Sequence, residues 1–230
     1  MTTFLLVHGA FCNHWVWSDT ASALEERGHR VHTVDLPSCG PVASELGDLQ
    51  ADVTALRHKL DGLEEDVVLV GHSGAGAPLA ELADHRAVRH SIFVAALHPS
   101  RGQSLADMLG GRVPDWTVLR PDGAVQVSEQ VEVARQALCA DVDAERFARD
   151  VHPRYLLTSM SSLATASTAP DRTHPATYVV CEQDRVVPVE AQEAMAGSLD
   201  SVERLPSSHS PMLSMPGRLA EVLARAGAGS

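Results

Sequence analysis

The sequence predicts an α/β fold with a mainly parallel sheet and helices on both of its faces. Short apolar runs are typical of strands covered on both sides, and amphipathic helical segments alternate with these runs along the chain. Alternation of this kind implies parallel strands joined by right-handed crossovers. The 230 residues are 44% hydrophobic and 21% charged, so the chain can bury the core that such a fold requires.

The first 97 residues follow this alternation closely. Gly28 ends the first predicted helix, and in the second helix Leu49, Val53, Leu56 and Leu60 recur at spacings of three and four on one face. The predicted elements are a strand at 4–7, a helix at 15–26, a strand at 31–36, a helix around 49–63, a strand at 67–70, a helix at 74–84 and a strand at 90–97.

The alternation stops between residues 99 and 169. This segment contains no run that is typical of a strand, but it contains short helical pieces at 129–138, 144–151 and 154–160. We therefore expect a small helical cap at 99–169, inserted into a core formed by residues 1–98 and 170–230. The core resumes with a strand at 177–181 and helices at 189–197 and 217–226, and the final residues 225–230 are expected to fray.

Composition excludes several classes of partner and cofactor. The net charge of −12, with no cluster of Lys or Arg, disfavours nucleic acid, and the longest apolar runs are far shorter than a membrane span. The N-terminal residues lack the features of a signal peptide, so we expect a cytoplasmic protein that does not bind a membrane. Four widely spaced cysteines and scattered histidines indicate neither a metal site nor a cofactor. The oligomeric state stays open, a homodimer included.

The stretch VLVGHSGAG at residues 68–76 carries the main functional signal. It matches neither the phosphate-binding pattern G-x-x-x-x-G-K-[ST] nor the dinucleotide pattern G-x-G-x-x-G. Gly71, Ser73 and Ala75 instead give G-x-S-x-A, which differs from the nucleophile elbow G-x-S-x-G by one methyl group. An elbow needs small residues around a serine that is held in strained backbone geometry. The motif therefore predicts that Ser73 is a nucleophile.

A serine hydroxyl needs a base and an orienting acid, and both are available later in the chain. Asp184 follows the strand at 177–181, and His209 lies in a loop before the last helix, which gives the order Ser, Asp, His. Glu182 is a second candidate for the acid. The backbone N–H groups of Gly74 and Ala10 are the candidates for the oxyanion hole, because Gly74 follows the serine and Ala10 follows the first strand.

These residues resemble the α/β-hydrolase superfamily, and within it the small branch of plant methyl-ester esterases, hydroxynitrile lyases and bacterial esterase-like proteins. The matching stretches include FLLVHGAF, VVLVGHSGAG, CEQDRVVP and SSHSPMLSMP, and the resemblance covers the core from residue 4 to residue 216. It implies Ser73, Asp184 and His209 as a catalytic triad, with Ala10 and Gly74 as oxyanion donors. Relatives usually carry GHSxGG with a larger residue after the serine, where this chain has Gly74.

The sequence thus predicts a serine hydrolase that cleaves an uncharged small-molecule ester through an acyl-enzyme, with no metal or cofactor. A hydroxynitrile lyase on the same triad is the first alternative. Lyases of this branch carry a lysine directly after the histidine, whereas this chain has Ser210. The second alternative is a ligand-binding protein that has kept the fold and lost turnover.

Overall fold

A six-stranded sheet forms the centre of the computed structural model, which describes residues 1–228. Every neighbouring pair of strands is parallel. Across the sheet the strands are β10 (Ser201–Leu205), β9 (Ala176–Cys181), β5 (Val88–Val94), β4 (Val67–His72), β1 (Thr3–Val7) and β2 (Arg30–Val34).

Helices cover both faces of this sheet because successive side chains of a strand point to opposite sides. In β1, Phe4 and Leu6 belong to one buried apolar cluster, and Leu5 and Val7 belong to another. The first cluster packs against α1 (Ser18–Glu25) and α10 (Pro216–Ala228), and the second packs against α2 (Leu49–Asp61), α3 (Gly76–Glu81) and α8 (Val189–Ala196). Continuous apolar strands are therefore what this position in the fold requires.

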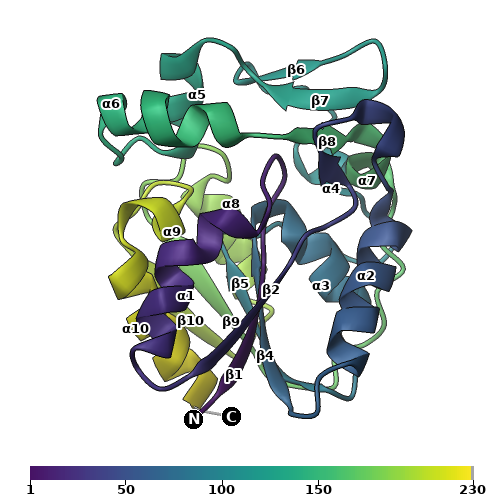
Figure 1. Ribbon diagram of the computed structural model, residues 1–230. Coiled ribbons are helices and arrows are strands. Elements are labelled where there is room, and N and C mark those ends of the chain that lie inside the picture. The colour runs from purple at the N-terminus through teal and green to yellow at the C-terminus, as the bar shows by residue number, and fades with distance from the viewer. Residues whose placement is uncertain (229–230) are drawn as a thin grey trace.

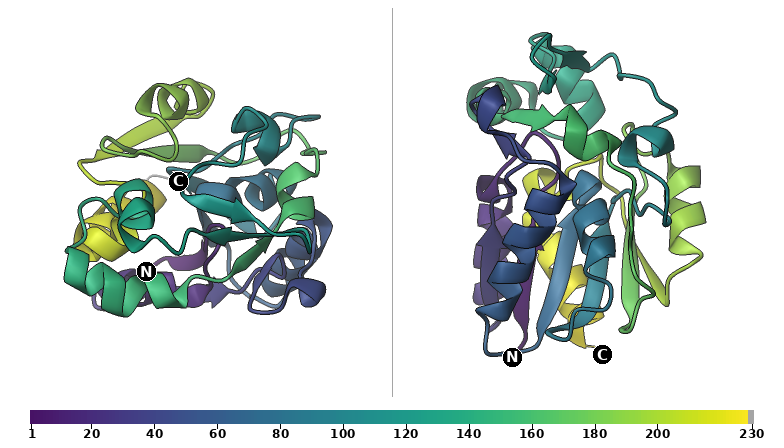
Figure 2. Two further views of the ribbon diagram at one scale, coloured as in Figure 1. Left: turned by 90° about the horizontal axis from the view of Figure 1, so that it is seen from above. Right: turned by 90° about the vertical axis from the view of Figure 1, so that its right-hand side faces the viewer.

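The segment 99–169 lies above the carboxyl ends of the central strands, at the top of Figure 1 and of the right-hand view of Figure 2. It contributes most of a second, antiparallel sheet, in the order β3 (Cys39–Gly40), β8 (Leu157–Ser159), β7 (Ala124–Val127) and β6 (Thr117–Leu119). Its helical parts are α4 (Leu105–Met108), α5 (Val131–Leu138), α6 (Ala144–Arg146), the π-helical turn η4 (Phe147–Val151), the 3₁₀ turn η5 (His152–Arg154) and α7 (Met160–Ala164).

The expected helical pieces are partly present, but the expectation that this segment contains no strand was wrong. Each of the three strands that it contains has only three or four residues, too few for an apolar period to identify. The predicted helix at 154–160 is replaced by η5 and β8, because Leu157 pairs with Gly40, and Thr158 pairs with both Cys39 and Val125. Pairing with distant residues overrides the local helical pattern here.

Several boundaries of the core also differ from the predicted ones. The first predicted helix begins as a 3₁₀ turn, η1 (His14–Trp17), before α1, and a further turn, η2 (Ala43–Glu45), precedes α2. The edge strand β10 was not predicted, because most of its residues face solvent. Helix α10 continues through Ala228, so the predicted frayed tail is wrong for residues 225–228, and residues 229–230 lie outside the described part.

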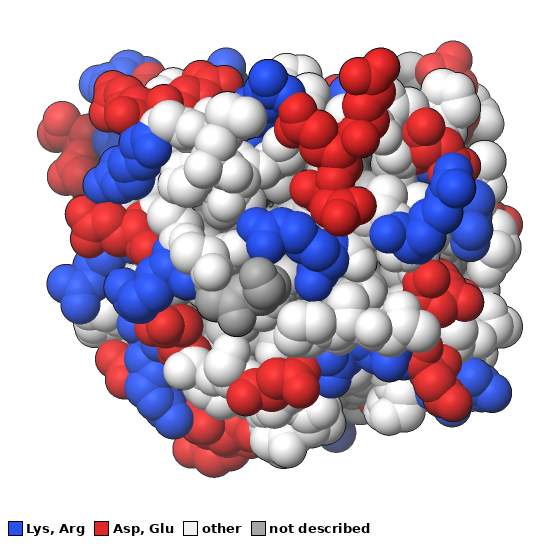
Figure 3. Space-filling model, turned by 90° about the horizontal axis from the view of Figure 1, so that it is seen from below, with Lys and Arg blue, Asp and Glu red and all other residues white. Residues whose placement is uncertain are grey.

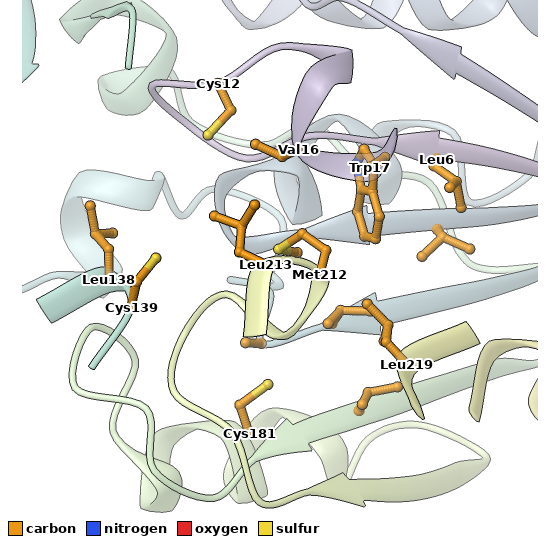
Figure 4. Packing of buried hydrophobic residues seen from close by; sticks show 14 of the residues in the cluster. Leu6, Cys12, Val16, Trp17, Leu138, Cys139, Cys181, Met212, Leu213 and Leu219 are labelled. Atoms are coloured by element: carbon orange, nitrogen blue, oxygen red, sulfur yellow. The ribbon is translucent and has the colours of Figure 1, made fainter. Parts of the chain in front are cut away.

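The segment 99–169 shares one apolar cluster with the core. Figure 4 shows Leu138 and Cys139 from this segment in the same cluster as Leu213, which lies in α9 (Pro211–Ser214), and Leu6 of the sheet. At the opposite end of the molecule, Figure 3 shows acidic and basic side chains interspersed. Among residues 1–228, no helix has the length and apolar character needed to cross a bilayer.

Candidate active site

Ser73 lies at a tight turn between β4, which ends at His72, and the 3₁₀ turn η3 (Ser73–Ala75) that leads into α3. Its φ of 53° falls in the left-handed region, which a residue with a Cβ rarely adopts. The turn is crowded, since a Cβ on Gly71 would lie 2.6 Å from a methyl group of Leu79, and one on Gly76 would lie 2.0 Å from the carbonyl oxygen of Leu97. Backbone strain of this kind is common at functional sites.

The structure brings Ser73, His209 and Asp184 together from three loops at the carboxyl edge of the sheet. The hydroxyl Oγ of Ser73 lies 2.9 Å from Nε2 of His209, and Nδ1 of His209 lies 2.7 Å from Oδ2 of Asp184. The side chains of His209 and Asp184 are 2% and 0% exposed, so this hydrogen-bond chain is shielded from water. Glu182, the rival acid, is exposed to solvent.

Asp184 is held by groups that the sequence did not indicate. Its Oδ1 accepts hydrogen bonds from the backbone N–H groups of Val186 at 2.7 Å and Val187 at 3.1 Å. Its Oδ2 accepts one at 3.2 Å from the side-chain amide of Gln192, a residue with no exposed surface. Gln192 also donates to the carbonyl of Val187 at 2.8 Å, so its orientation is fixed. Only the tertiary fold identifies Gln192, because its sequence neighbours form an ordinary helix.

His209 is also fixed through its backbone. Nε2 of His72 donates to the carbonyl oxygen of His209 at 2.8 Å, and the two rings lie 4.7 Å apart. Burial lowers the pKa of His72 well below its usual range, so His72 is a neutral donor. Ser208, the residue directly before His209, is held by the carboxylate of Asp141 from the segment 99–169. This carboxylate accepts hydrogen bonds from the hydroxyl of Ser208 and, at 3.0 Å, from its backbone N–H.

The backbones of Ala10 and Gly74 lie close together beside Ser73, and both residues line the same cavity. Ala10 lies beyond the end of β1, and Gly74 lies in the first turn of η3, where N–H groups have no acceptor within the helix. A Cβ on Gly74 would lie 3.6 Å from the nitrogen of Ala10, which shows how closely the two loops approach.

The loop that carries Ala10 is anchored on both sides. Nδ1 of His8 donates to the carbonyl of Gly9 at 2.8 Å, and Nε2 of His8 accepts from the N–H of Leu36 at 2.9 Å. Burial lowers the pKa of His8 to about 4, so this bridge stays neutral. Phe11, at a φ of 66°, donates its N–H to the hydroxyl of Thr158 at 2.7 Å.

A cavity of about 90 Å³ opens onto Ser73 and His209. Its walls come from both the core and the segment 99–169, and apart from the site itself they are mainly apolar, including Phe11, Leu97, Leu105, Leu109, Trp116, Val125, Leu138 and Met160. Neither His98 nor Arg185 lines this cavity. The ring of His98 packs against that of Phe93, with the two centroids 4.7 Å apart, and Arg185 donates a hydrogen bond to the side chain of Gln136. No three His, Cys, Asp or Glu side chains within 1–228 are placed to hold a metal ion together.

Comparisons with known proteins agree with this architecture. A family model described as "Alpha/beta hydrolase family" matches residues 4–222. Methylesterase 7 of Arabidopsis thaliana is 29% identical over 245 residues, which are 96% of this chain and 94% of the relative. The carbendazim hydrolyzing esterase of Nocardioides sp. (strain SG-4G) is 37% identical over 120 residues, which are half of each chain.

A solved structure gives the same result. The crystal structure of a pyrethroid hydrolase from Sphingobium faniae JZ-2 matches with a TM-score of 0.84 and 26% identity, covering 97% of this chain and 96% of the other. These matches confirm the fold class that the alternation of strands and helices predicted, and they confirm the resemblance to the α/β-hydrolase superfamily. Because the family model matches nearly the whole sequence, the chain belongs to the alpha/beta hydrolase family.

Proposed function

We propose that this protein is a serine hydrolase that cleaves an uncharged carboxylic ester through an acyl-enzyme. Its family and its relatives, which are named esterases and hydrolases, make it a carboxylic ester hydrolase. The finer assignment has Ser73 as nucleophile, His209 as general base and acid, and Asp184 as the group that orients His209. The observation that carries it is the buried hydrogen-bond chain from Asp184 through His209 to Ser73.

In the first half-reaction, Oγ of Ser73 attacks the ester carbonyl while Nε2 of His209 takes the hydroxyl proton. Asp184 keeps the other histidine proton on Nδ1 and stabilises the imidazolium that forms. The negative charge on the carbonyl oxygen is stabilised by the N–H groups of Ala10 and Gly74, which are fixed before the substrate binds. His209 then passes its proton to the alcohol oxygen, the carbon–oxygen bond breaks, and the alcohol leaves.

In the second half-reaction, water takes the place of the alcohol. His209 removes a proton from this water, the water oxygen attacks the acyl carbon, and the bond to Ser73 breaks as Oγ regains a proton. The carboxylic acid then leaves. The cavity walls are mainly apolar, with Arg112 as the only Lys, Arg, Asp or Glu among the described residues that line them, so apolar contact dominates the binding of an uncharged ester.

We also propose that residues 99–169 act as a cap that shapes the substrate site, over a core formed by residues 1–98 and 170–230. The support is the origin of the cavity walls, because Leu105, Trp116, Val125 and Met160 all come from this segment and face the same cavity as Ser73. The chemistry then belongs to the core and the choice among esters belongs to the cap.

The two alternatives differ from this proposal in their products. A cyanohydrin lyase must stabilise a departing cyanide anion, which favours a fixed positive charge beside the triad. The residue after His209 is the neutral Ser210, so no positive charge stands at that position. Arg185, the residue after Asp184, is held by the side chain of Gln136. A ligand-binding protein without turnover would not need the strained backbone at Ser73 or the aligned hydrogen bonds.

The experiment compares release of p-nitrophenol from p-nitrophenyl butyrate with release of cyanide from mandelonitrile. The proposal predicts ester turnover that Ser73→Ala abolishes, and no cyanide above background. Ser44→Ala, which changes an exposed serine, is the matched control and should retain full turnover. Cyanide release without ester turnover would support the lyase, and binding without either product would support the ligand-binding protein.

A further inference from the structure

The cavity wall is bare at Gly74, the residue directly after the nucleophile. Gly74 lines the cavity, and apart from its two chain neighbours the residues nearest to a Cβ built on it are Ala10 and Leu105, both at 3.6 Å. This separation is ordinary van der Waals contact, so a methyl group bonded to Gly74 would fit among the protein's own atoms, and its absence leaves room in this part of the cavity. The room lies next to the N–H of Ala10, that is, beside the position proposed for the oxyanion.

The proposed reaction decides which part of an ester would fill this room. His209 must reach the alcohol oxygen in order to protonate it, so the alcohol lies on the side of His209. The carbonyl oxygen points at the N–H groups of Ala10 and Gly74. The remaining bond of the reacting carbon leads to the acyl group, which must extend away from His209.

The apolar clusters of the fold separate these two directions. Helix α9, which begins two residues after His209, places Met212 and Leu213 in the cluster on the α1 and α10 face. Leu105 and Leu109 line the cavity but belong to the cluster on the α2 and α3 face, together with Leu97. The wall beside Gly74 is therefore the expected acyl side of the cavity, since it packs toward the other face of the sheet from α9.

Leu105 limits the room beside Gly74 at a fixed distance. It is the first residue of α4, and it is 4% exposed. A capping box holds this helix start: the N–H of Asp107 donates to the hydroxyl of Ser104 at 3.1 Å, and the N–H of Ser104 donates to the carboxylate of Asp107 at 2.9 Å. Such a box satisfies free N–H groups at the helix start and stabilises it, which favours this position of Leu105 over one closer to Gly74.

We propose that Gly74 and Leu105 together select esters whose acid is branched at the carbon next to the carbonyl. The branch packs from the cavity against the Cα of Gly74, where a methyl group bonded to that Cα would collide with it. This inference rests on the proposed acyl-enzyme reaction and adds the class of acid to it.

The test uses two isomeric substrates, p-nitrophenyl isobutyrate and p-nitrophenyl n-butyrate, which differ only in the position of one methyl group. The unaltered protein should hydrolyse isobutyrate with a kcat/KM at least equal to that for n-butyrate. Gly74→Ala should lower the ratio of the two values by about tenfold or more, the effect expected for one misplaced methyl group. Alanine is allowed at this position because the φ of Gly74 lies outside the left-handed region.

Two further variants separate a filled pocket from a damaged site. Gly217→Ala adds the same methyl group where nothing lies within 4 Å, and it should leave the ratio unchanged. Leu105→Val shortens the opposite wall, and combined with Gly74→Ala it should restore part of the lost isobutyrate preference. Thermal unfolding of each variant shows whether it has folded.

Three outcomes would overturn the inference. An unaltered protein that hydrolyses n-butyrate but rejects isobutyrate contradicts it and leaves the proposed function intact. Equal loss of both activities in Gly74→Ala contradicts it too, since the methyl group would then disturb the oxyanion site instead of the acyl group. Failure of the unaltered protein to hydrolyse either ester contradicts the proposed function as well.

Discussion

Replacing Asp184 by asparagine changes one atom and, by the geometry of the site, reverses the histidine tautomer. Oδ1 of Asp184 accepts two backbone hydrogen bonds, from Val186 and Val187. The carbonyl oxygen of an asparagine must take this place, because an NH₂ group there would leave both N–H groups without an acceptor. The NH₂ group then faces Nδ1 of His209, which has to accept a hydrogen bond, and the proton moves to Nε2. A protonated Nε2 cannot take the proton of Ser73.

The expected loss in kcat for Asp184→Asn is about 10⁴-fold, the effect of the wrong tautomer in a Ser-His-Asp triad. This corresponds to about 5 kcal/mol of transition-state stabilisation. The assay is steady-state hydrolysis of p-nitrophenyl butyrate, with circular dichroism to show that the variant has folded. Glu182→Gln alters an exposed carboxylate two residues earlier and should keep full activity. The reasoning fails if Asp184→Asn stays within tenfold of the unaltered protein, or if Glu182→Gln causes the loss instead.

Two further predictions concern the contacts between the core and residues 99–169. Burial raises the pKa of Asp52, which accepts from the hydroxyl of Ser162, to about 6. The native state therefore binds more protons than the unfolded chain between about pH 4 and pH 6, and stability falls as pH rises through this window, by about 3 kcal/mol. Urea unfolding at several pH values tests this. Between pH 4 and pH 7 the free energy of unfolding of Asp52→Asn should rise by this amount relative to that of the unaltered protein, and a difference that does not change with pH would contradict the prediction. Asp141→Asn should lower kcat for an ester by about tenfold with little change in KM, because Ser208 loses a charged hydrogen-bond partner. The control Asp150→Asn, which alters another carboxylate of the same segment, should have no effect. Equal losses of kcat in the two variants would contradict the role of Asp141.

The parts of the fold that were predicted are those with buried, continuous apolar strands. Residues 4–7, 67–70 and 177–181 lie in β1, β4 and β9, with helices on both sides of each, and such runs differ clearly from their surroundings. The edge strand β10 carries polar side chains that face solvent, and the strands of the segment 99–169 are too short to show a period. Their existence depends on pairing with distant residues, which one sequence does not reveal.

The candidate site, like the fold, could be predicted only in part from the sequence. Ser73 and Asp184 could be selected because each follows a recognisable strand end. His209 could be selected because it lies in a loop before the last helix, in the expected chain order, and the structure brings the three within hydrogen-bond distance. The residues that hold them were not predicted. Gln192 lies in the middle of a helix, Asp141 comes from a different segment, and His72 belongs to the motif around Ser73 without any sign of its contact with His209. Each acts through tertiary hydrogen bonds that have no local signature.

The most direct test of the proposed chemistry is the site of covalent labelling by a fluorophosphonate, located by mass spectrometry of peptides from the labelled protein. A serine activated by its histidine reacts with this reagent, whereas an ordinary serine does not. One adduct is expected, on Ser73, and it should be lost in His209→Ala, which removes the base 2.9 Å away. An adduct on another serine, or labelling of Ser73 that persists undiminished in His209→Ala, would contradict the assignment of Ser73 as an activated nucleophile.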